Sequence, residues 1–85
     1  MKKRIGSVAV VVEQREKVSN QINKILSKNA DCIIGRMGIP SAEHGLSMIS
    51  LIVEGTSDEI GAMTGQLGSL PGVNLKSALT SVEVK

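Results

Sequence analysis

Residues 46–73 read LSMISLIVEGTSDEIGAMTGQLGSLPGV, and this stretch decides the fold. Its first eight residues place apolar side chains on both faces of an extended chain, which is typical of an interior strand. Thr56 and Glu59 have the spacing of a capping box, so a helix should begin directly after the strand. Pro71 and Gly72 then end that helix and start another strand through Leu75. The core face of the predicted helix consists of Ile60, Met63, Leu67 and Leu70.

The first half of the chain repeats this pattern. Residues 5–12 form a strand-like run in which Val8, Val10 and Val12 share one face. Residues 15–28 place their apolar side chains at helical spacing. Residues 30–39 read as a second strand that Pro40 ends, and residues 41–45 turn the chain. The apolar stripe of the predicted helix consists of Val18, Ile22, Ile25 and Leu26.

The two units, residues 4–39 and 46–82, give the order βαββαβ, an α+β fold of ferredoxin-like type. Right-handed crossovers place both helices on one face of a four-stranded antiparallel sheet, with the first and third strands in the middle. A single domain spanning residues 1–85 accounts for almost the whole chain. Because the alternation changes phase at Val82 and Val84, we expect a bulge after Leu79, or a terminus that orders only against a partner.

The composition excludes some classes of function. At 85 residues the domain is marginally stable on its own, which favours association with a partner. The absence of Phe, Tyr and Trp and a net charge of only +2 argue against direct nucleic-acid binding. With one cysteine, no signal peptide and no long apolar span, we expect a cytoplasmic protein without membrane contact.

The second face of the predicted sheet points to an oligomer. Two helices cover one face only, yet Ala9, Val11, Met48 and Ile52 carry apolar surface to the other. Leaving that surface in water costs roughly 25 cal/mol for each Å² that could be buried. We therefore predict a homo-oligomer, a dimer or tetramer, with Val11, Met48 and Ile52 in the interface.

Three glycines of the second predicted helix form a stripe. Gly61, Gly65 and Gly68 each cost roughly 1 kcal/mol relative to alanine, and they lie well away from the core face of the helix. Either the helix tolerates them as a weak segment, or the stripe lets another backbone or a flat ligand approach. We predict the contact, and so assign these glycines to an interface.

The candidate ligand-binding residues are Gly35, Arg36, Met37, Gly38 and His44. The glycines remove side chains from the strand around Arg36, so a ligand could lie against the backbone while the guanidinium pairs with a carboxylate or phosphate. The alternative is a kinked strand with an exposed arginine. A further open question is the row of Lys17, Lys24 and Lys28, which is either a solvated face or an anion site.

Catalysis, metal binding and bound cofactors are not expected. Cys32 and His44 are the only soft ligands, and they lie at opposite ends of a hairpin arm. Cys32, beside Ile33 in a predicted strand, fits a core position. No serine or aspartate stands at triad spacing, and Asp58 is explained as a charge at a helix N-terminus. An enzyme would need Cys32 and His44 from different subunits.

Three stretches resemble a known family. They are residues 35–40 (GRMGIP), residues 49–61 (ISLIVEGTSDEIG) and residues 67–73 (LGSLPGV), and they are similar to the small bacterial regulators of the iron-only hydrogenase system. The resemblance implies an ACT-like fold, similar to the ligand-binding domain of the nickel-responsive repressor, in a small oligomer. The glycine that amino-acid-binding ACT domains carry after the first strand is replaced here by Glu13, Gln14 and Arg15. The nickel repressor's ligands are also missing, so no site residue is carried over.

These patterns favour a non-enzymatic regulatory or ligand-sensing module. As the resemblance implies, it would regulate an iron-only hydrogenase system, as an oligomer without a DNA-binding element of its own. It would respond to a small-molecule effector or a protein partner. The alternative is a structural assembly subunit with no small-molecule ligand.

Overall fold

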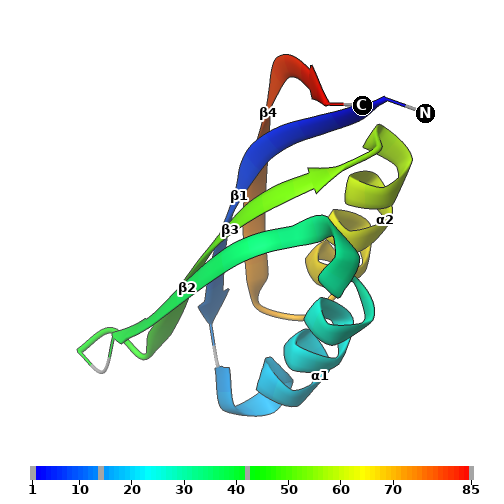
Figure 1. Ribbon diagram of the computed structural model, residues 1–85. Helices are drawn as coiled ribbons and strands as arrows, with labels where there is room; N and C mark the ends of the chain where they lie inside the picture. Colours follow the sequence, from blue (N-terminus) through cyan, green and yellow to red (C-terminus); the bar gives the residue numbers. More distant parts are fainter. Residues whose placement is uncertain (1, 14, 42, 85) are drawn as a thin grey trace.

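A computed structural model describes residues 2–13, 15–41 and 43–84 of the chain (Figure 1). The order of the main elements is βαββαβ, as the sequence predicts. The elements are β1 (Lys3–Glu13), α1 (Arg15–Lys28), a short 3-10 helix η1 (Ala30–Cys32), β2 (Ile33–Ser41), β3 (Leu46–Gly55), α2 (Ser57–Gly68) and β4 (Val73–Val84).

The four strands form one antiparallel sheet in the order β2-β3-β1-β4. The central positions of β1 and β3 are therefore confirmed. In the register of the sheet, Val8 lies opposite Leu51 of β3 and opposite Ser77 of β4. Because side chains alternate along each strand, this register sends Val8 and Leu51 to the same side of the sheet, beneath the helices.

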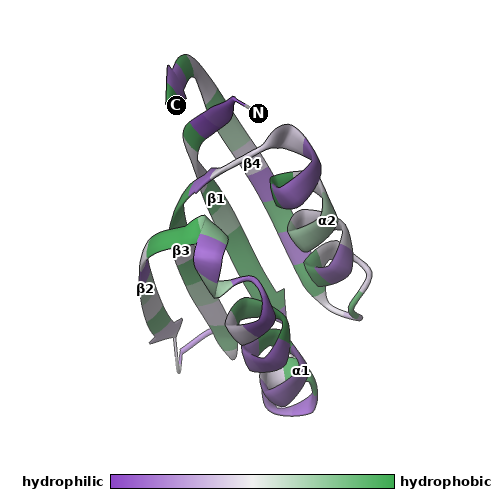
Figure 2. Cartoon of the chain, turned by 45° about the vertical axis from the view of Figure 1, so that its right-hand side comes forward, coloured by the Kyte–Doolittle hydropathy of each residue, from purple (hydrophilic) through white to green (hydrophobic). Residues whose placement is uncertain are grey.

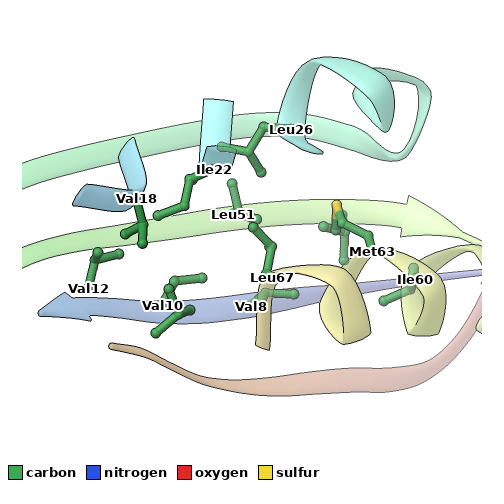
Figure 3. Close-up of a cluster of buried hydrophobic side chains, with 12 residues drawn as sticks. Val8, Val10, Val12, Val18, Ile22, Leu26, Leu51, Ile60, Met63 and Leu67 are labelled. Atoms are coloured by element: carbon green, nitrogen blue, oxygen red, sulfur yellow. The ribbon is translucent and has the colours of Figure 1, made fainter. Parts of the chain in front are cut away.

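Both helices pack on that side of the sheet (Figure 1), and the core lies between the two layers (Figure 3). Apolar side chains from β1, β3, α1 and α2 meet there, together with Val73 at the start of β4. The predicted phases of β1, α1 and α2 are confirmed by the residues that fill the core. They are Val8, Val10, Val12, Val18, Ile22, Leu26, Leu51, Val53, Ile60, Met63, Leu67 and Val73.

A capping box starts α2, as the Thr56 and Glu59 spacing predicts. The Thr56 amide donates a hydrogen bond of 2.8 Å to Oε1 of Glu59, and the Glu59 amide donates one of 3.1 Å to Oγ1 of Thr56. These bonds satisfy two amide groups that a helix end leaves without partners. The pKa of the Glu59 carboxyl is lowered by hydrogen bonding to Thr56, chiefly from its backbone amide and then from its side chain.

The second strand differs from the prediction at both ends. Residues 30–32 form η1 rather than strand, because the Cys32 amide bonds back to the Asn29 carbonyl oxygen at 2.9 Å. At the other end, Pro40 does not end β2 but pairs with Ser47 of β3. Since β2 is an edge strand, one side of its backbone has no neighbouring strand, and a proline is tolerated there.

Two irregularities change the register of the sheet. Arg4 pairs with Glu83 and Gly6 with Leu79, so residues 80–82 bulge out opposite Ile5. This confirms the bulge predicted after Leu79, and Oγ1 of Thr80 secures it by donating a hydrogen bond of 2.7 Å to the Ile5 carbonyl oxygen. The second shift lies between Ile33 and Gly35, at the start of β2.

The two ends of the described chain lie side by side, and the β2–β3 hairpin extends away from the helices (Figure 1). An ion pair of 3.2 Å between Nζ of Lys2 and Oε2 of Glu83 joins the ends. Neither α1 nor α2 has the length and apolar composition to cross a membrane; this holds for the residues described.

Candidate functional site

The side of the sheet away from the helices, called the open face below, carries a patch of exposed apolar side chains. Cross-strand pairs fix its composition, because Val11 lies opposite Met48 and Met48 lies opposite Ile39. The position of Val11, Met48 and Ile52 on the uncovered face is as predicted, and their burial by a subunit stays a prediction. The patch consists of Val11, Met37, Ile39, Met48 and Ile52, with exposed fractions from 36% to 63%.

A shallow hollow of about 270 Å³ lies within this patch. Val11, Met37, Ile39 and Met48 line it, together with Ser50 and other small or aliphatic residues, and no charged side chain takes part. Aliphatic and thioether side chains cannot transfer protons or act as nucleophiles. The hollow can therefore bury apolar surface of a partner, and Ser50 supplies the hydroxyl among its lining side chains.

Sequence reasoning missed the contribution of β2 to the open face. Met37 was assigned to ligand binding and Ile39 to no site, yet both belong to the patch because the shift at the start of β2 pairs Gly35 with Ile52 and Met37 with Ser50. The alternation of Gly35, Met37 and Ile39 was the available signal. It could not be connected to the open face without knowing the register between β2 and β3.

The predicted ligand-binding residues are divided among three places. Arg36 pairs with Leu51 and Gly38 with Ile49, so these two face the helix side of the sheet. Gly35 and Met37 face the open side. His44 is exposed in the turn that joins β2 and β3, at the far end of the hairpin. The structure does not bring the five residues together, and ligand binding by any of them stays a prediction.

Arg36 borders a hollow of about 310 Å³ between β2 and the end of α1. Leu26, Ile33 and Ile34 supply most of the apolar lining, and Ser27 lies at its edge. In the described part of the chain no carboxylate forms an ion pair with Arg36. Its guanidinium thus remains available to a carboxylate or phosphate.

The glycine stripe of α2 faces outward. A Cβ atom added at Gly61 or Gly65 would meet no other atom within 4 Å, and one at Gly68 would lie 3.9 Å from Cδ2 of Leu75. The stripe is therefore turned away from the core of its own subunit, as predicted. Whether a partner backbone or a ligand covers it is a prediction that these contacts do not test.

A groove runs between the two helices on the outer side of the molecule. It has a volume of about 480 Å³. At its end, Nδ2 of Asn29 donates hydrogen bonds to the Ile25 carbonyl oxygen at 2.8 Å and to Oε1 of Gln66 at 3.3 Å, which links α1 to α2. Figure 2 shows that α1 is hydrophilic along much of its outer surface. The lining of this inter-helix groove consists of Lys24, Ile25, Lys28, Gln66, Ser69 and Leu70.

Sequence reasoning identified the lysines of this groove as a row but not the groove itself. Its apolar residues, Ile25 and Leu70, were both assigned to core stripes. The structure does pack them against the core, but each keeps part of its surface exposed between the helices. The groove exists only where two separate helices meet, so no local pattern predicts it.

Cys32 occupies a core position, as predicted, although in η1 rather than in a strand. Its side chain is buried against Gly55, where an added Cβ would lie 3.3 Å from Sγ. Burial raises the pKa of the Cys32 thiol, and the nearby carboxylates of Glu59 and Asp31 raise it further. A protonated, buried thiol is a poor nucleophile and a poor metal ligand. Among the residues described, no three histidine, cysteine or acidic side chains gather as metal ligands do.

Comparison with protein families gives one match that covers most of the chain. The family model described as "TM1266-like: Iron-only hydrogenase system regulator, putative" matches residues 4–77. The solved structure of the uncharacterized protein TM1266 from Thermotoga maritima is similar at 35% sequence identity, with a TM-score of 0.89. The match covers 93% of this chain and 99% of that chain.

More distant structures share the fold alone. The ACT domain of GTP pyrophosphokinase from Chlorobium tepidum is 20% identical, with a TM-score of 0.70, over 89% of this chain and 99% of that domain. The apo form of CPII, a nitrogen regulatory PII-like protein from Thiomonas intermedia, is 7% identical, with a TM-score of 0.60, over 100% and 98% of the two chains. The fold is thus ACT-like, as the resemblance implied. A search among functionally curated proteins finds no match.

Proposed function

Because the chain belongs to the TM1266-like family of iron-only hydrogenase system regulators, we propose that it is a non-enzymatic regulatory module that acts as a homo-oligomer, a dimer or tetramer. Residues 1–85 would form a single ACT-like domain. This module responds to a small-molecule effector or a protein partner, without direct contact to nucleic acid or membrane. Its place of action is the cytoplasm, where the free thiol of Cys32 would stay reduced.

The apolar patch on the open face is the observation that carries this proposal. Five large apolar side chains lie together on the uncovered side of a small sheet, and such patches on soluble domains mark sites of association. Fully burying an aliphatic side chain gains about 1.5–3 kcal/mol, so half-exposed residues would each gain roughly 1 kcal/mol from a covering subunit. A second copy of the chain brings the same patch and suits a self-complementary contact.

The oligomer is tested by sedimentation velocity on the wild type and on Ile52→Glu. The new carboxylate would lie in a desolvated contact, so we expect the variant to sediment as a smaller species with a lower melting temperature. The matched control is Val82→Glu, which adds the same charge at an exposed apolar residue in the β4 bulge, outside the patch. An Ile52→Glu protein that sediments like the wild type would contradict the proposed interface.

Sensing is distinguished from mere assembly by a thermal-shift screen against amino acids, nucleotides and metal ions. A ligand present at a hundred times its dissociation constant adds about 2.7 kcal/mol to stability. If a compound raises the melting temperature and Arg36→Ala abolishes the effect, the effector site lies at the hollow between β2 and α1. If no compound raises the melting temperature, the chain fits the alternative of a structural assembly subunit.

A further inference from the structure

We propose that the inter-helix groove is a docking site for an acidic segment of a partner protein, one that carries an aliphatic side chain between its carboxylates. The groove lies in the helix layer, on the opposite side of the sheet from the open face. This groove would be a second binding surface of the proposed regulatory module, and its binding can be tested independently of the oligomeric state.

The floor of the groove is apolar and held in place. Ile25 and Leu70 both pack against the hydrophobic core while keeping part of their side chains exposed to the groove. The hydrogen bonds of Asn29 to Ile25 and Gln66 tie the two helices together at this point. A partner side chain therefore meets a preformed surface, and little conformational entropy is lost in shaping it.

The charge of the groove is carried by one wall. Lys24 and Lys28 lie one helical turn apart on α1, and like charges at this spacing destabilise a helix. Within the described ranges neither lysine has a carboxylate within ion-pair distance. The opposite wall, formed by Gln66 and Ser69, is uncharged. An acidic ligand would relieve the repulsion between the lysines, and the uncharged wall offers hydrogen bonds without repelling it.

The lysine row favours a chain-like ligand. Lys17 continues the row of Lys24 and Lys28 toward the start of α1, over a length of about 16 Å at a rise of 1.5 Å per residue. An extended segment of about five residues has this length. The groove is also open to solvent, whereas small-molecule sites enclose most of the ligand surface. A peptide, which needs no enclosure, fits these dimensions better.

The chemistry favours protein over nucleic acid. The lysines are a single short row beside an apolar floor, and the chain contains no aromatic side chain on which a base could stack. Phosphates would gain contact with the lysines but nothing from Ile25 and Leu70. A segment with both carboxylates and a leucine or isoleucine uses every part of the groove.

The direct test is an NMR titration of isotope-labelled protein with a short synthetic peptide of glutamates around a central leucine pair. We expect saturable shifts at Lys24, Ile25, Lys28, Gln66 and Ser69, and none at the open face. Two control peptides separate the contributions: one replaces the leucines by serine, and one replaces the glutamates by lysine. Both should bind at least several-fold more weakly.

A double variant, Lys24→Ala with Lys28→Ala, tests the charged wall. Exposed ion pairs contribute about 0.2–1 kcal/mol each, so losing two should weaken peptide binding about fivefold. Lys76→Ala is the matched control, because Lys76 is an exposed lysine of β4 that pairs with Ala9, and it should leave binding unchanged. All three lysines are exposed, so the variants should fold normally.

Three outcomes would overturn the proposal. The first is that the double variant binds the peptide as tightly as the wild type does. The second is that the chemical shift changes are confined to the open face. The third is that a single-stranded oligonucleotide binds at the groove more tightly than the peptide. Repeating the titration with Ile52→Glu keeps the two proposals apart. A peptide that binds this variant normally supports the groove whatever the oligomeric state, and sedimentation alone decides the oligomer.

Discussion

Replacing Gly6 by alanine should strongly lower the free energy of unfolding, because there is no space for the added methyl group. Gly6 is buried in the centre of the sheet, where it pairs with Val53 of β3 and with Leu79 of β4 beside the bulge. A Cβ at this position would lie 2.8 Å from both Cα and Cδ2 of Leu79, and it would collide with the carbonyl oxygen of Ala78. Two of these atoms belong to the backbone, so no change of rotamer relieves the overlap.

The expected loss follows from two opposing terms. Overpacking a dense core costs up to about 3 kcal/mol. Replacing a glycine by alanine also restricts the unfolded chain, which returns about 0.4–1 kcal/mol. The free energy of unfolding of Gly6→Ala should therefore fall by about 2 kcal/mol. For a domain of this size, the melting temperature should drop by about 8–16 °C.

The assay is thermal and urea denaturation followed by circular dichroism, at one protein concentration so that association contributes equally. Gly38→Ala is the matched control, since it makes the same change in a strand of the same sheet, where an added Cβ meets nothing within 4 Å. It should melt at or slightly above the wild-type temperature. A Gly6→Ala protein as stable as Gly38→Ala would refute the argument that β1 and β4 must approach closely at this point.

Two further substitutions test the second helix. If a partner backbone or a flat ligand covers the glycine stripe, Gly65→Ala should weaken oligomer or ligand affinity. The measurement is the melting temperature over about a hundredfold range of protein concentration. A Gly65→Ala protein that is more stable at every concentration and assembles as the wild type does would contradict the contact. Thr56→Ala should lose about 1 kcal/mol of stability through the missing cap. Because the folded-state pKa of Glu59 is depressed below its ordinary value of 4.5, its contribution is present above that value and is lost as the pH falls through the folded pKa. Thr56→Ala keeps the amide of residue 56, which is the main cause of the lowered pKa, and removes the side-chain cause, so it should reduce the acid-side loss of stability in part. Urea denaturation from about pH 7 to about pH 3 measures this, and an unchanged pH dependence would contradict the role of the Thr56 side chain.

The fold was predictable where local rules and the period of the apolar residues agree. The valines of β1 alternate, the core stripe of α1 repeats at helical spacing, and Thr56 with Glu59 marks the start of α2 to the residue. The start and end of β2 were not predictable in the same way. Residues 30–32 form a 3-10 turn, and Pro40 is tolerated only because β2 lies at the edge, which is a property of the whole sheet.

The candidate sites depend still more on tertiary structure. A shift of one residue at the start of β2 decides that Met37 faces the open side and Arg36 the helix side, and pairing with β3 sets that shift. The inter-helix groove likewise needs Ile25 and Leu70, which are far apart in sequence, to become neighbours. Local patterns identified the residue types at both sites, but only the assembled sheet and helices determine which of them act together.

The positions of the two proposed surfaces have a consequence for regulation. In each chain both helices lie on one side of the sheet (Figure 2). Subunits joined through the open face would keep these helix layers on the outside, so a dimer would present two inter-helix grooves at once. A partner with two acidic segments, or a partner that is itself dimeric, could then occupy both grooves of one dimer. The second contact would form at the high effective concentration set by the first, so two individually weak contacts would give tight binding. Dissociation of the dimer, by an effector or by dilution, would remove that advantage without changing either groove.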